Sequence, residues 1–280
     1  RDVTDDIHPH VAYHAVLAAR TVGLDVAGLD MVLEDISRPL EEQGGAIVEV
    51  NAGPGLLMHL SPSVGKPRPV GEAIISQMFA PGDNARIPIV CITGSNGKTT
   101  VARLVRHFLR LAGMNVGLAD SEGCFAGKWQ TARGTCDDAA HAGSLLLNPE
   151  IEAAVFEAGA KGILTAGLAC DKVDLAIVTN LADPDHLGGE FDLYEIEKVF
   201  AVKRTPVDVV LPTGAAVLNA EDTLSLAMKV LSKGDTVLFA HGGLLPAVQE
   251  HLQEGKRAVI AEHGEVLLCE GEEQRLLISL

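Results

Sequence analysis

The chain contains the run Thr93-Gly94-Ser95-Asn96-Gly97-Lys98-Thr99-Thr100, which lies between a strand-like apolar run and an amphipathic helical run. Glycines let the backbone approach a polyphosphate, and the start of the helix supplies positive potential. Lys98 adds a full charge, and Thr99 offers a hydroxyl to a phosphate-bound Mg²⁺. The stretch therefore predicts a P-loop that binds a nucleoside triphosphate.

The bulk composition indicates a globular protein with reduced thiols. At 280 residues, 47% of them hydrophobic, the chain is long enough for one large domain or two ordinary ones. The net charge of −16 argues against nucleic acid and anionic membranes as partners. The five cysteines form no C-x-x-C pair and lie far apart, as is typical of cytosolic proteins.

The sequence also bears on location and completeness. No stretch approaches the roughly 20 apolar residues that a membrane-spanning helix needs. We therefore expect a cytoplasmic protein. The chain begins with Arg1 rather than methionine, and we expect it to be a piece of a longer polypeptide.

The first part of the chain predicts a small α+β unit. Residues 8–22 have the spacing of a helix with one buried face, and Gly23 ends it. Residues 26–33 and 46–50 predict two strands, and residues 70–78 predict another helix. Residues 52–86 are otherwise rich in Gly, Pro and Ser, so we place the domain boundary within residues 80–86 and expect domains at residues 1–83 and 84–280.

Beyond the boundary, strand-like and helix-like runs alternate, which predicts an α/β fold with a doubly wound, mostly parallel sheet. The expected parallel strands are residues 88–93, 115–119, 153–157, 174–180, 215–219, 236–240 and 257–261. Residues 265–269 and 275–279 alternate like a terminal antiparallel hairpin.

Polar residues end two of these strands. Glu157 ends one, Asn180 ends the next, and His186 follows shortly after Asn180. Ligands of open parallel sheets bind at the carboxyl ends of the strands. Mg²⁺ takes one or two protein ligands besides phosphate oxygens, and Thr99, Glu157 and His186 are the candidates.

The P-loop departs from the form G-x-x-x-x-G-K-[ST], because Ile92 stands where that form has a glycine. Its form T-G-x-N-G-K-T-T resembles the P-loop of the Mur ligase family, whose members form amide bonds with ATP. Residues 157–188 and the run Val217-Leu218-Asn219-Ala220-Glu221-Asp222 resemble other parts of that family's central ATPase domain. The resemblance implies an ATP-binding set of Thr93, Gly94, Ser95, Asn96, Gly97, Lys98, Thr99, Thr100, Asn180 and Asn219.

The same resemblance implies a catalytic set of Lys98, Glu157, His186 and Lys203. In Mur ligases the corresponding glutamate and the histidine of the D-H-L motif help to hold magnesium. These ligases also use a lysine that CO₂ carbamylates, and Lys203 stands in the comparable place. Lys198 is a competing candidate, and a solvated lysine at a helix end is the plainer alternative.

The first unit resembles the C-terminal part of an ATP-grasp ligase. The resemblance rests on Gly28-Leu29-Asp30-Met31-Val32 and on Val48-Glu49-Val50-Asn51-Ala52-Gly53-Pro54-Gly55. It implies that Asp30, Glu49 and Asn51 hold Mg²⁺ beside a second ATP. Glu49 and Asn51 are two residues apart on a strand, so their side chains share one face, while Val48 and Val50 take the other.

An ATP-grasp module followed by a Mur-type module is the arrangement of the cyanophycin synthetase family, which polymerises aspartate and arginine. The resemblance implies an ATP-dependent ligase that joins an acid to an amine through an acyl phosphate. It implies aspartate, arginine and a growing peptide primer as partners, without nucleic acid or membrane. A homo-oligomer is a further possibility that the sequence leaves open. We expect the adenine-clamping part of the ATP-grasp fold and the Mur C-terminal lid domain to lie outside the chain.

Two departures from that family leave alternatives open. Its G-D-x-x-G-P reads Gly134-Thr135-Cys136-Asp137-Asp138-Ala139 here, and its E-T-A-R-G-G reads Glu157-Ala158-Gly159-Ala160-Lys161-Gly162. A lysine does not replace the forked guanidinium of arginine at a phosphate or carboxylate site. The alternatives are a ligase with another amino acid substrate, a ligase with a decayed second site, and an ATP-binding regulatory or scaffold protein.

Overall fold

The computed structural model describes residues 1–181 and 188–280. The chain divides into two compact units, Arg1–Arg86 and Ile87–Leu280. Within the described residues, every helix is too short or too polar to cross a membrane.

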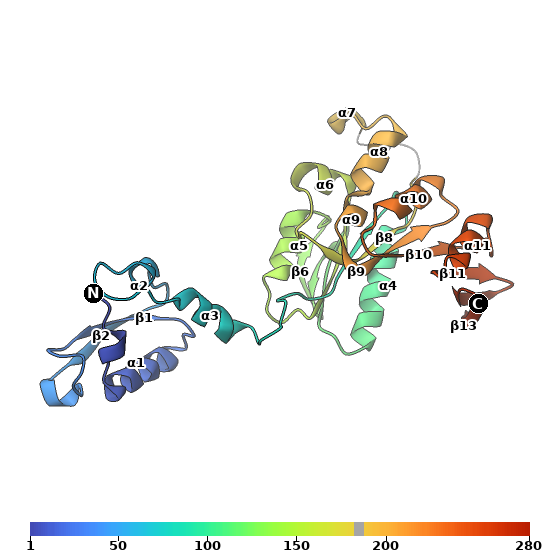
Figure 1. The fold of residues 1–280 in the computed structure, drawn as a ribbon. Coiled ribbons are helices and arrows are strands. Elements are labelled where there is room, and N and C mark those ends of the chain that lie inside the picture. The colour runs from blue at the N-terminus through green and yellow to red at the C-terminus, as the bar shows by residue number, and fades with distance from the viewer. Residues whose placement is uncertain (182–187) are drawn as a thin grey trace. The chain divides into compact units, whose positions relative to one another are not determined.

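The first unit combines a helix with a two-stranded antiparallel hairpin (Figure 1). Helix α1 (Pro9–Val22) starts with a proline, which has the φ that a first helical turn needs. It ends at Gly23, whose φ of 82° is left-handed. The other elements are η1 (Thr4–Asp6), β1 (Gly28–Val32), η2 (Glu41–Gln43), β2 (Ala46–Asn51), α2 (Leu57–Leu60) and α3 (Val70–Met78).

The hairpin contains a β-bulge that the sequence did not indicate. Asp30 pairs with Glu49, but Met31 pairs with Ile47, so Val48 is an extra residue in the ladder. Val48 is 64% exposed, whereas Val50 is half-buried. The regular alternation predicted for this strand is therefore wrong at Val48, because a bulge interrupts the period of two.

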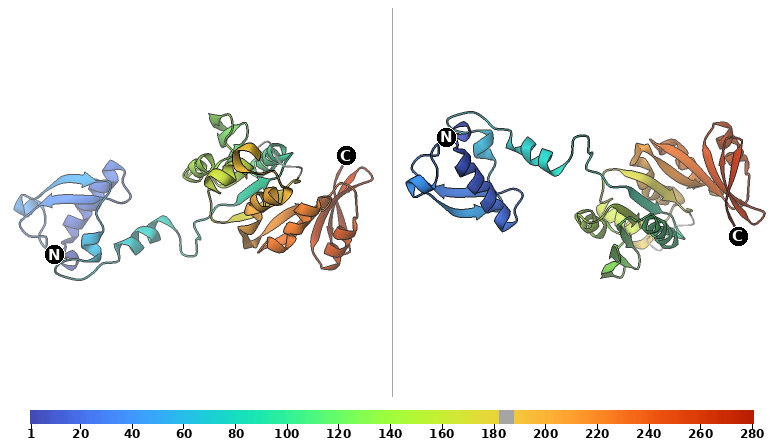
Figure 2. Two further views of the ribbon diagram at one scale, coloured as in Figure 1. Left: turned by 90° about the horizontal axis from the view of Figure 1, so that it is seen from above. Right: turned by 90° about the horizontal axis from the view of Figure 1, so that it is seen from below.

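The second unit is built on one eleven-stranded sheet, in the order β13-β12-β11-β10-β9-β8-β3-β7-β4-β5-β6. The strands from β11 to β4 in this order pair in parallel. The hairpins β5–β6 and β12–β13 add antiparallel edges (Figures 1 and 2). The predicted doubly wound, mostly parallel sheet is confirmed, as is the antiparallel hairpin at the end of the chain.

The strand bounds are β3 (Ile89–Thr93), β4 (Val116–Asp120), β5 (Gly123–Ala126), β6 (Trp129–Arg133), β7 (Ala153–Glu157), β8 (Val173–Val178), β9 (Val210–Asn219), β10 (Asp235–Ala240), β11 (Arg257–Glu262), β12 (Glu265–Glu270) and β13 (Glu273–Ser279). The helices are α4 (Lys98–Leu111), α5 (Ala139–Leu146), α6 (Ala160–Ala166), α7 (Gly188–Phe191), α8 (Ile196–Lys203), α9 (Thr205–Asp208), α10 (Thr223–Ala227), η3 (Met228–Leu231) and α11 (Pro246–Gln253). The sequence did not indicate strands at β5 and β6. These two form a short edge hairpin, and β6 is mostly exposed.

The central strands β3, β4 and β7 of this sheet are buried on both faces. Successive residues of a strand point to opposite faces, and β3 divides its side chains between two cores accordingly. Val90 and Ile92 pack in the core that includes residues of α4. Ile89 and Cys91 pack in a larger core with residues of α5, η3 and α11. Burial on both faces agrees with the apolar sequence of β3 from Ile89 to Ile92. The P-loop follows at the carboxyl end of this strand.

A fully buried histidine packs between α11 and β10. His251 is 0% exposed, and its Nε2 lies 3.0 Å from the backbone oxygen of Thr236. Among the described residues, Nδ1 has no hydrogen-bond partner. Burial and the nearby Lys229 lower the pKa of His251 below the usual 6.5. The folded protein therefore holds this imidazole neutral, with its proton on Nε2.

We expect the free energy of unfolding to fall as the pH drops below about 6.5, because the unfolded chain then binds a proton at His251 that the folded chain does not bind. Above that pH, His251 does not contribute to the pH dependence of the free energy of unfolding. The loss of stability levels off below the pKa of His251 in the folded protein. In His251→Gln the pH dependence should be shallower by up to one proton, as measured by urea unfolding from about pH 7 to about pH 5. The same change at exposed His107 is the control, and equal slopes for wild type and His251→Gln would contradict the prediction.

Candidate active site

The P-loop joins the buried strand β3 to helix α4. Thr93 ends the strand with 0% exposure, and Lys98 begins the helix. Gly94 and Gly97 have φ angles of 136° and 81°, which side chains with a Cβ rarely adopt. Within the described residues no side chain caps α4, so its first N–H groups can bind an anion.

The loop is seated on the end of the neighbouring strand β8. Asn180 accepts hydrogen bonds from the backbone of Ser95 through its own backbone oxygen (2.8 Å) and from that of Asn96 through Oδ1 (3.1 Å). Thr179 Oγ1 donates to the backbone oxygen of Asn96 at 2.6 Å. Asn219 Nδ2 donates to the backbone oxygen of Thr179 at 2.9 Å. Of the two predicted asparagines, Asn180 therefore contacts the P-loop directly. Asn219 contacts Thr179, which in turn supports the loop.

Gly94 is where the loop and β8 approach most closely. A Cβ at this position would lie 2.0 Å from Thr179 Oγ1 and 3.0 Å from the backbone oxygen of Asn180. No side chain fits in that space. The shape of the phosphate cradle therefore depends on a glycine at position 94.

Three oxygen-bearing side chains meet at the start of α4. Thr99 Oγ1 donates to Glu157 Oε2 at 2.8 Å and lies 2.8 Å from Ser121 Oγ. The backbone N–H of Ser121 also donates to Glu157 Oε2, at 3.1 Å. Lys98 Nζ lies 3.7 Å from Glu157 Oε1, and the Glu157 side chain is 2% exposed. Hard oxygen donors beside a glycine cradle are what Mg²⁺ on a phosphate requires, so these residues fit the ion that the resemblance implies.

Ser121 is a site residue that the sequence analysis missed. It directly follows β4, at the same carboxyl edge of the sheet as Glu157 and the P-loop. A polar residue directly after a predicted parallel strand is a candidate ligand-binding residue, and this pattern could have identified Ser121 from the sequence. The preceding Asp120 fixes its loop, because Asp120 Oδ1 accepts from the backbone N–H groups of Glu122 and Gly123.

A second carboxyl group lies close to Glu157. Asp137 lines a pocket together with Glu157 and Cys91. Burial, and next the charge of Glu157, raises the pKa of Asp137. A cation bound beside Glu157 would relieve this repulsion, because it offsets the negative charge of both groups.

The structure distinguishes between the two lysine candidates. Lys203 is 1% exposed, and its Nζ donates to Ser95 Oγ in the P-loop at 3.0 Å. Lys198 instead pairs with Asp192, at 2.7 Å. Lys203 is therefore the lysine that lies at the loop. The predicted His186 lies outside the described residues.

The predicted ATP-grasp residues lie together in the first unit. Asp30 stands opposite Glu49 in the hairpin, and Asn51 Nδ2 donates to Glu49 Oε1 at 3.0 Å. All three side chains are exposed. Two carboxylates and an amide oxygen on one hairpin form a set of hard donors that suits Mg²⁺.

Three residues in the segments that resemble the family have structural contacts of their own. Lys161 Nζ pairs with Glu190 at 2.9 Å, and its side chain is 57% exposed. Glu221 Oε1 accepts from the backbone N–H groups of His241 and Gly242. Asp222 caps α10 and also accepts from the backbone N–H of Leu181. Of these three, Asp222 reaches the end of β8 that supports the P-loop.

Comparison with known proteins gives the class that this fold and site define. The family described as the Mur ligase middle domain matches residues 92–260. The chain therefore belongs to the Mur ligase family, and the predicted resemblance to that family is confirmed.

Among individual proteins, the chain is 41% identical to the cyanophycin synthetase of Synechocystis sp. over 271 residues, which are 96% of this chain and 31% of that protein. It is 40% identical to the cyanophycin synthetase of Geminocystis herdmanii over 272 residues, 97% of this chain and 31% of that protein. The predicted resemblance to cyanophycin synthetases is confirmed. The chain spans 31% of the length of these curated relatives.

A solved structure is similar in fold. The structure of UDP-N-acetylmuramoyl-L-alanyl-D-glutamate–2,6-diaminopimelate ligase has a TM-score of 0.53 at 17% identity. The match covers 74% of this chain and 42% of that one. The likeness supports the Mur-type fold of the sheet described above.

We expect Gly94→Ala to lower the free energy of unfolding by about 1–3 kcal/mol, because it forces an L side chain into a left-handed conformation against β8. Nucleotide affinity should fall at least tenfold, as measured by titration with a fluorescent ATP analogue. Gly143→Ala is the control: Gly143 lies inside α5, and a Cβ there would meet nothing within 4 Å. Alanine should stabilise that helix by about 0.5–1 kcal/mol. Unchanged stability and nucleotide affinity in Gly94→Ala would contradict the account of the cradle.

Proposed function

We propose that the chain is the part of a cyanophycin synthetase-like enzyme that contains its Mur-type nucleotide site, and that it uses ATP to join a carboxylate to an amine. The observation that carries the proposal is the contact between Lys98, Thr99 and Glu157 at the end of the P-loop. Identity of about 40% to cyanophycin synthetases over nearly the whole chain supports it.

In the proposed site the ATP phosphates lie over Gly94–Thr100, where the backbone N–H groups at the start of α4 face them. Lys98 Nζ stabilises the charge on the transferred γ-phosphoryl group. Thr99 and Glu157 hold Mg²⁺, with His186 as a further ligand and Ser121 Oγ alongside. When bound, Mg²⁺ offsets phosphate charge through fixed electrostatics.

The reaction proceeds in two displacements. An oxygen of the substrate carboxylate attacks the γ-phosphorus, the bond to the β-phosphate oxygen breaks, and ADP leaves. The amine nitrogen of the second substrate then attacks the acyl phosphate carbon. Phosphate leaves, the nitrogen loses a proton, and an amide remains. No protein nucleophile is required. The site residues act by positioning the substrates and by stabilising the charge on the transferred phosphoryl group.

Lys203 is assigned a positioning role at this site. Its amine is buried against Ser95 in the P-loop. Carbamylation of this amine by CO₂ would replace its positive charge with a negatively charged, carboxylate-like group. We propose that the carbamylated form acts next to the phosphates, as in the family that the chain belongs to.

The substrates follow from the two-unit organisation. We propose that the Mur-like site adds arginine to the side-chain carboxylate of aspartate on a growing peptide primer. In the first unit, Asp30, Glu49 and Asn51 would hold Mg²⁺ for ATP-dependent addition of aspartate to the backbone. The remaining parts of both catalytic modules would come from the rest of the full-length protein.

A second candidate is a ligase of the same type with a different amino acid substrate. The observation that favours it is Lys161, which stands where cyanophycin synthetases have an arginine and pairs with Glu190. A lysine offers a point charge where the arginine would offer two parallel hydrogen bonds. An ADP-release screen of the full-length protein with each amino acid and primer distinguishes the two candidates.

Lys98→Ala in the full-length protein should abolish arginine-dependent ADP release, because the charge that develops on the phosphoryl group loses its fixed cation. Lys128→Ala is the matched control, since Lys128 is exposed and its Nζ lies over the Trp129 ring. ADP release is followed by a coupled assay at saturating aspartate primer. Undiminished release in Lys98→Ala would refute the assignment of this site.

A further inference from the structure

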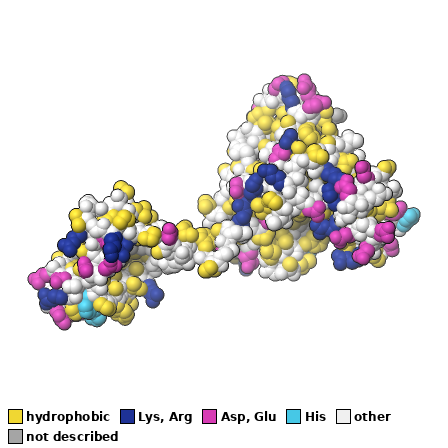
Figure 3. Space-filling view, in the orientation of Figure 1, with side chains coloured by type: hydrophobic (Ala, Val, Ile, Leu, Met, Phe, Trp, Pro, Cys, Tyr) yellow, Lys and Arg dark blue, Asp and Glu magenta, His cyan; other side chains and the backbone are white. Residues whose placement is uncertain are grey.

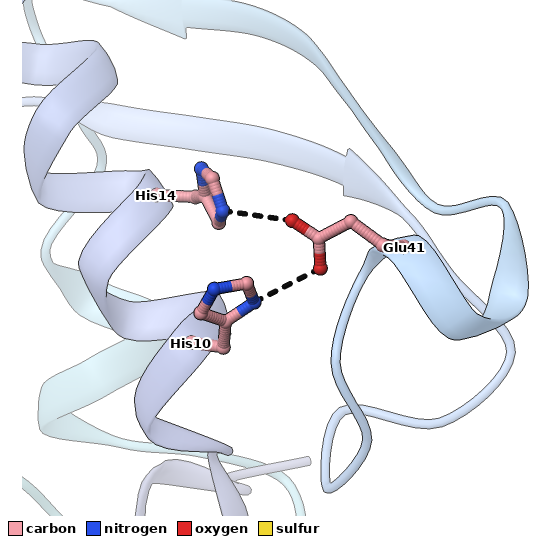
Figure 4. Close-up of side chains that lie close together, drawn as sticks. All are labelled: His10, His14 and Glu41. Atoms are coloured by element: carbon pink, nitrogen blue, oxygen red, sulfur yellow. Dashed lines mark hydrogen bonds and ion pairs between the residues drawn. The ribbon is translucent and has the colours of Figure 1, made fainter.

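The first unit carries a cluster of ligand-type side chains that has no part in the proposed ligase sites. His10 and His14 lie on α1, and Glu41 lies in the short helix η2 (Figure 4). His10 Nδ1 is 2.9 Å from Glu41 Oε2, and His14 Nε2 is 3.0 Å from Glu41 Oε1. Histidine and acidic side chains are visible together at the surface of this unit (Figure 3).

The helix and the turn bring these side chains to one point. Residues four apart on a helix lie on the same face, so His10 and His14 stand one turn apart. Their ring centroids are 4.7 Å apart. Glu41 comes from the connection between β1 and β2 and reaches both rings with one carboxylate (Figure 4).

The spacing of the ligand atoms suits a tetrahedral metal ion. Ligands at about 2.0–2.1 Å from Zn²⁺ in a tetrahedral arrangement lie about 3.3 Å from one another. One ligand atom from each of the three residues lies within 4.8 Å of the other two. The two nitrogens lie 2.9 and 3.0 Å from the two different oxygens of the Glu41 carboxylate.

Hydrogen bonding does not fully account for the cluster. The His10 contact is a well-formed hydrogen bond. His14 Nε2 is buried from solvent and close to Glu41, yet within the described residues it makes no contact with hydrogen-bond geometry. A buried polar atom without such a bond has a free-energy cost. A metal ion on Nε2 would remove it, because imidazole nitrogen donates its lone pair to the ion.

The donor set selects a different cation from the one proposed for the nucleotide sites. Two imidazole nitrogens and one carboxylate suit Zn²⁺ and related divalent ions, whereas Mg²⁺ prefers oxygen ligands. Three protein ligands leave a fourth position open to water. Of all the His, Cys, Asp and Glu side chains in residues 1–181 and 188–280, only these three form such a group.

We propose that His10 Nδ1, His14 Nε2 and a Glu41 carboxylate oxygen bind one zinc-type divalent transition-metal ion. The ion ties α1 to the connection between β1 and β2. That connection joins the strands that carry Asp30 and Glu49. Zinc therefore stabilises the first unit, because an ion that binds only the folded state adds to its free energy of unfolding.

The test uses the 280-residue chain after treatment with a chelator, in buffer with excess Mg²⁺ to fill oxygen sites. Zn²⁺ is titrated by calorimetry, and Co²⁺ by visible absorption, which reports tetrahedral nitrogen and oxygen ligands. We expect one Zn²⁺ per chain. His10→Ala, His14→Ala and Glu41→Gln should each weaken binding by about 100-fold or more, since even groups that contact a metal's ligands contribute 10–100-fold.

His59→Ala is the matched control, because His59 is an exposed histidine of the same unit. It should bind Zn²⁺ as the wild type does, and so should Lys98→Ala, which disables the proposed ligase site. Circular dichroism without metal verifies that each variant is folded. Equal Zn²⁺ affinity in wild type and His14→Ala, or no saturable binding in excess Mg²⁺, would overturn the proposal without affecting the proposed ligase function.

Discussion

The close approach of Gly94 to the end of β8 is the constraint on which the nucleotide site depends. Thr179 and Asn180 occupy the space that a side chain at position 94 would need, and they also hold the loop by hydrogen bonds. These contacts hold the loop against the end of β8 and thereby fix the orientation of the first turn of α4. Asn219 fixes the end of β8 in turn, so the cradle is supported by three adjacent parallel strands, β3, β8 and β9.

Around this cradle the protein collects charges that have little access to water. Lys98, Glu157, Lys203 and Asp137 all lie at the same edge of the sheet. Such groups interact more strongly here than they would in water, because the surrounding protein has a low dielectric constant. Burial, and next the charge of Glu157, raises the pKa of Asp137. A cation bound beside Glu157 and Asp137 would offset the repulsion between these two carboxylates, which agrees with the Mg²⁺ that we propose for the site.

The sequence sufficed for the features that depend on local patterns. The P-loop, the alternation of strands and helices, and the position of Glu157 all follow from short runs of residues. Three features could not be predicted in this way. The bulge at Val48 depends on the pairing register of two strands, and the short hairpin β5–β6 has no strong apolar alternation. The contact of Glu41 with His10 joins residues 31 positions apart, so only tertiary structure reveals it. Ser121 was within reach, because it follows a predicted strand at the edge where ligands bind.

The hydrogen bonds that seat the P-loop also determine when the site can form during synthesis. Asn96 bonds to Asn180 across 84 residues, and Ser95 bonds to Lys203 across 108. Contacts of this separation form slowly, because the intervening chain must first be ordered. A nascent chain that has emerged only as far as α4 has the P-loop sequence but not its support. The capacity to bind nucleotide therefore arises late in folding, after β8 has paired with β3. Nucleotide binding requires the folded core of this unit as well as the P-loop sequence.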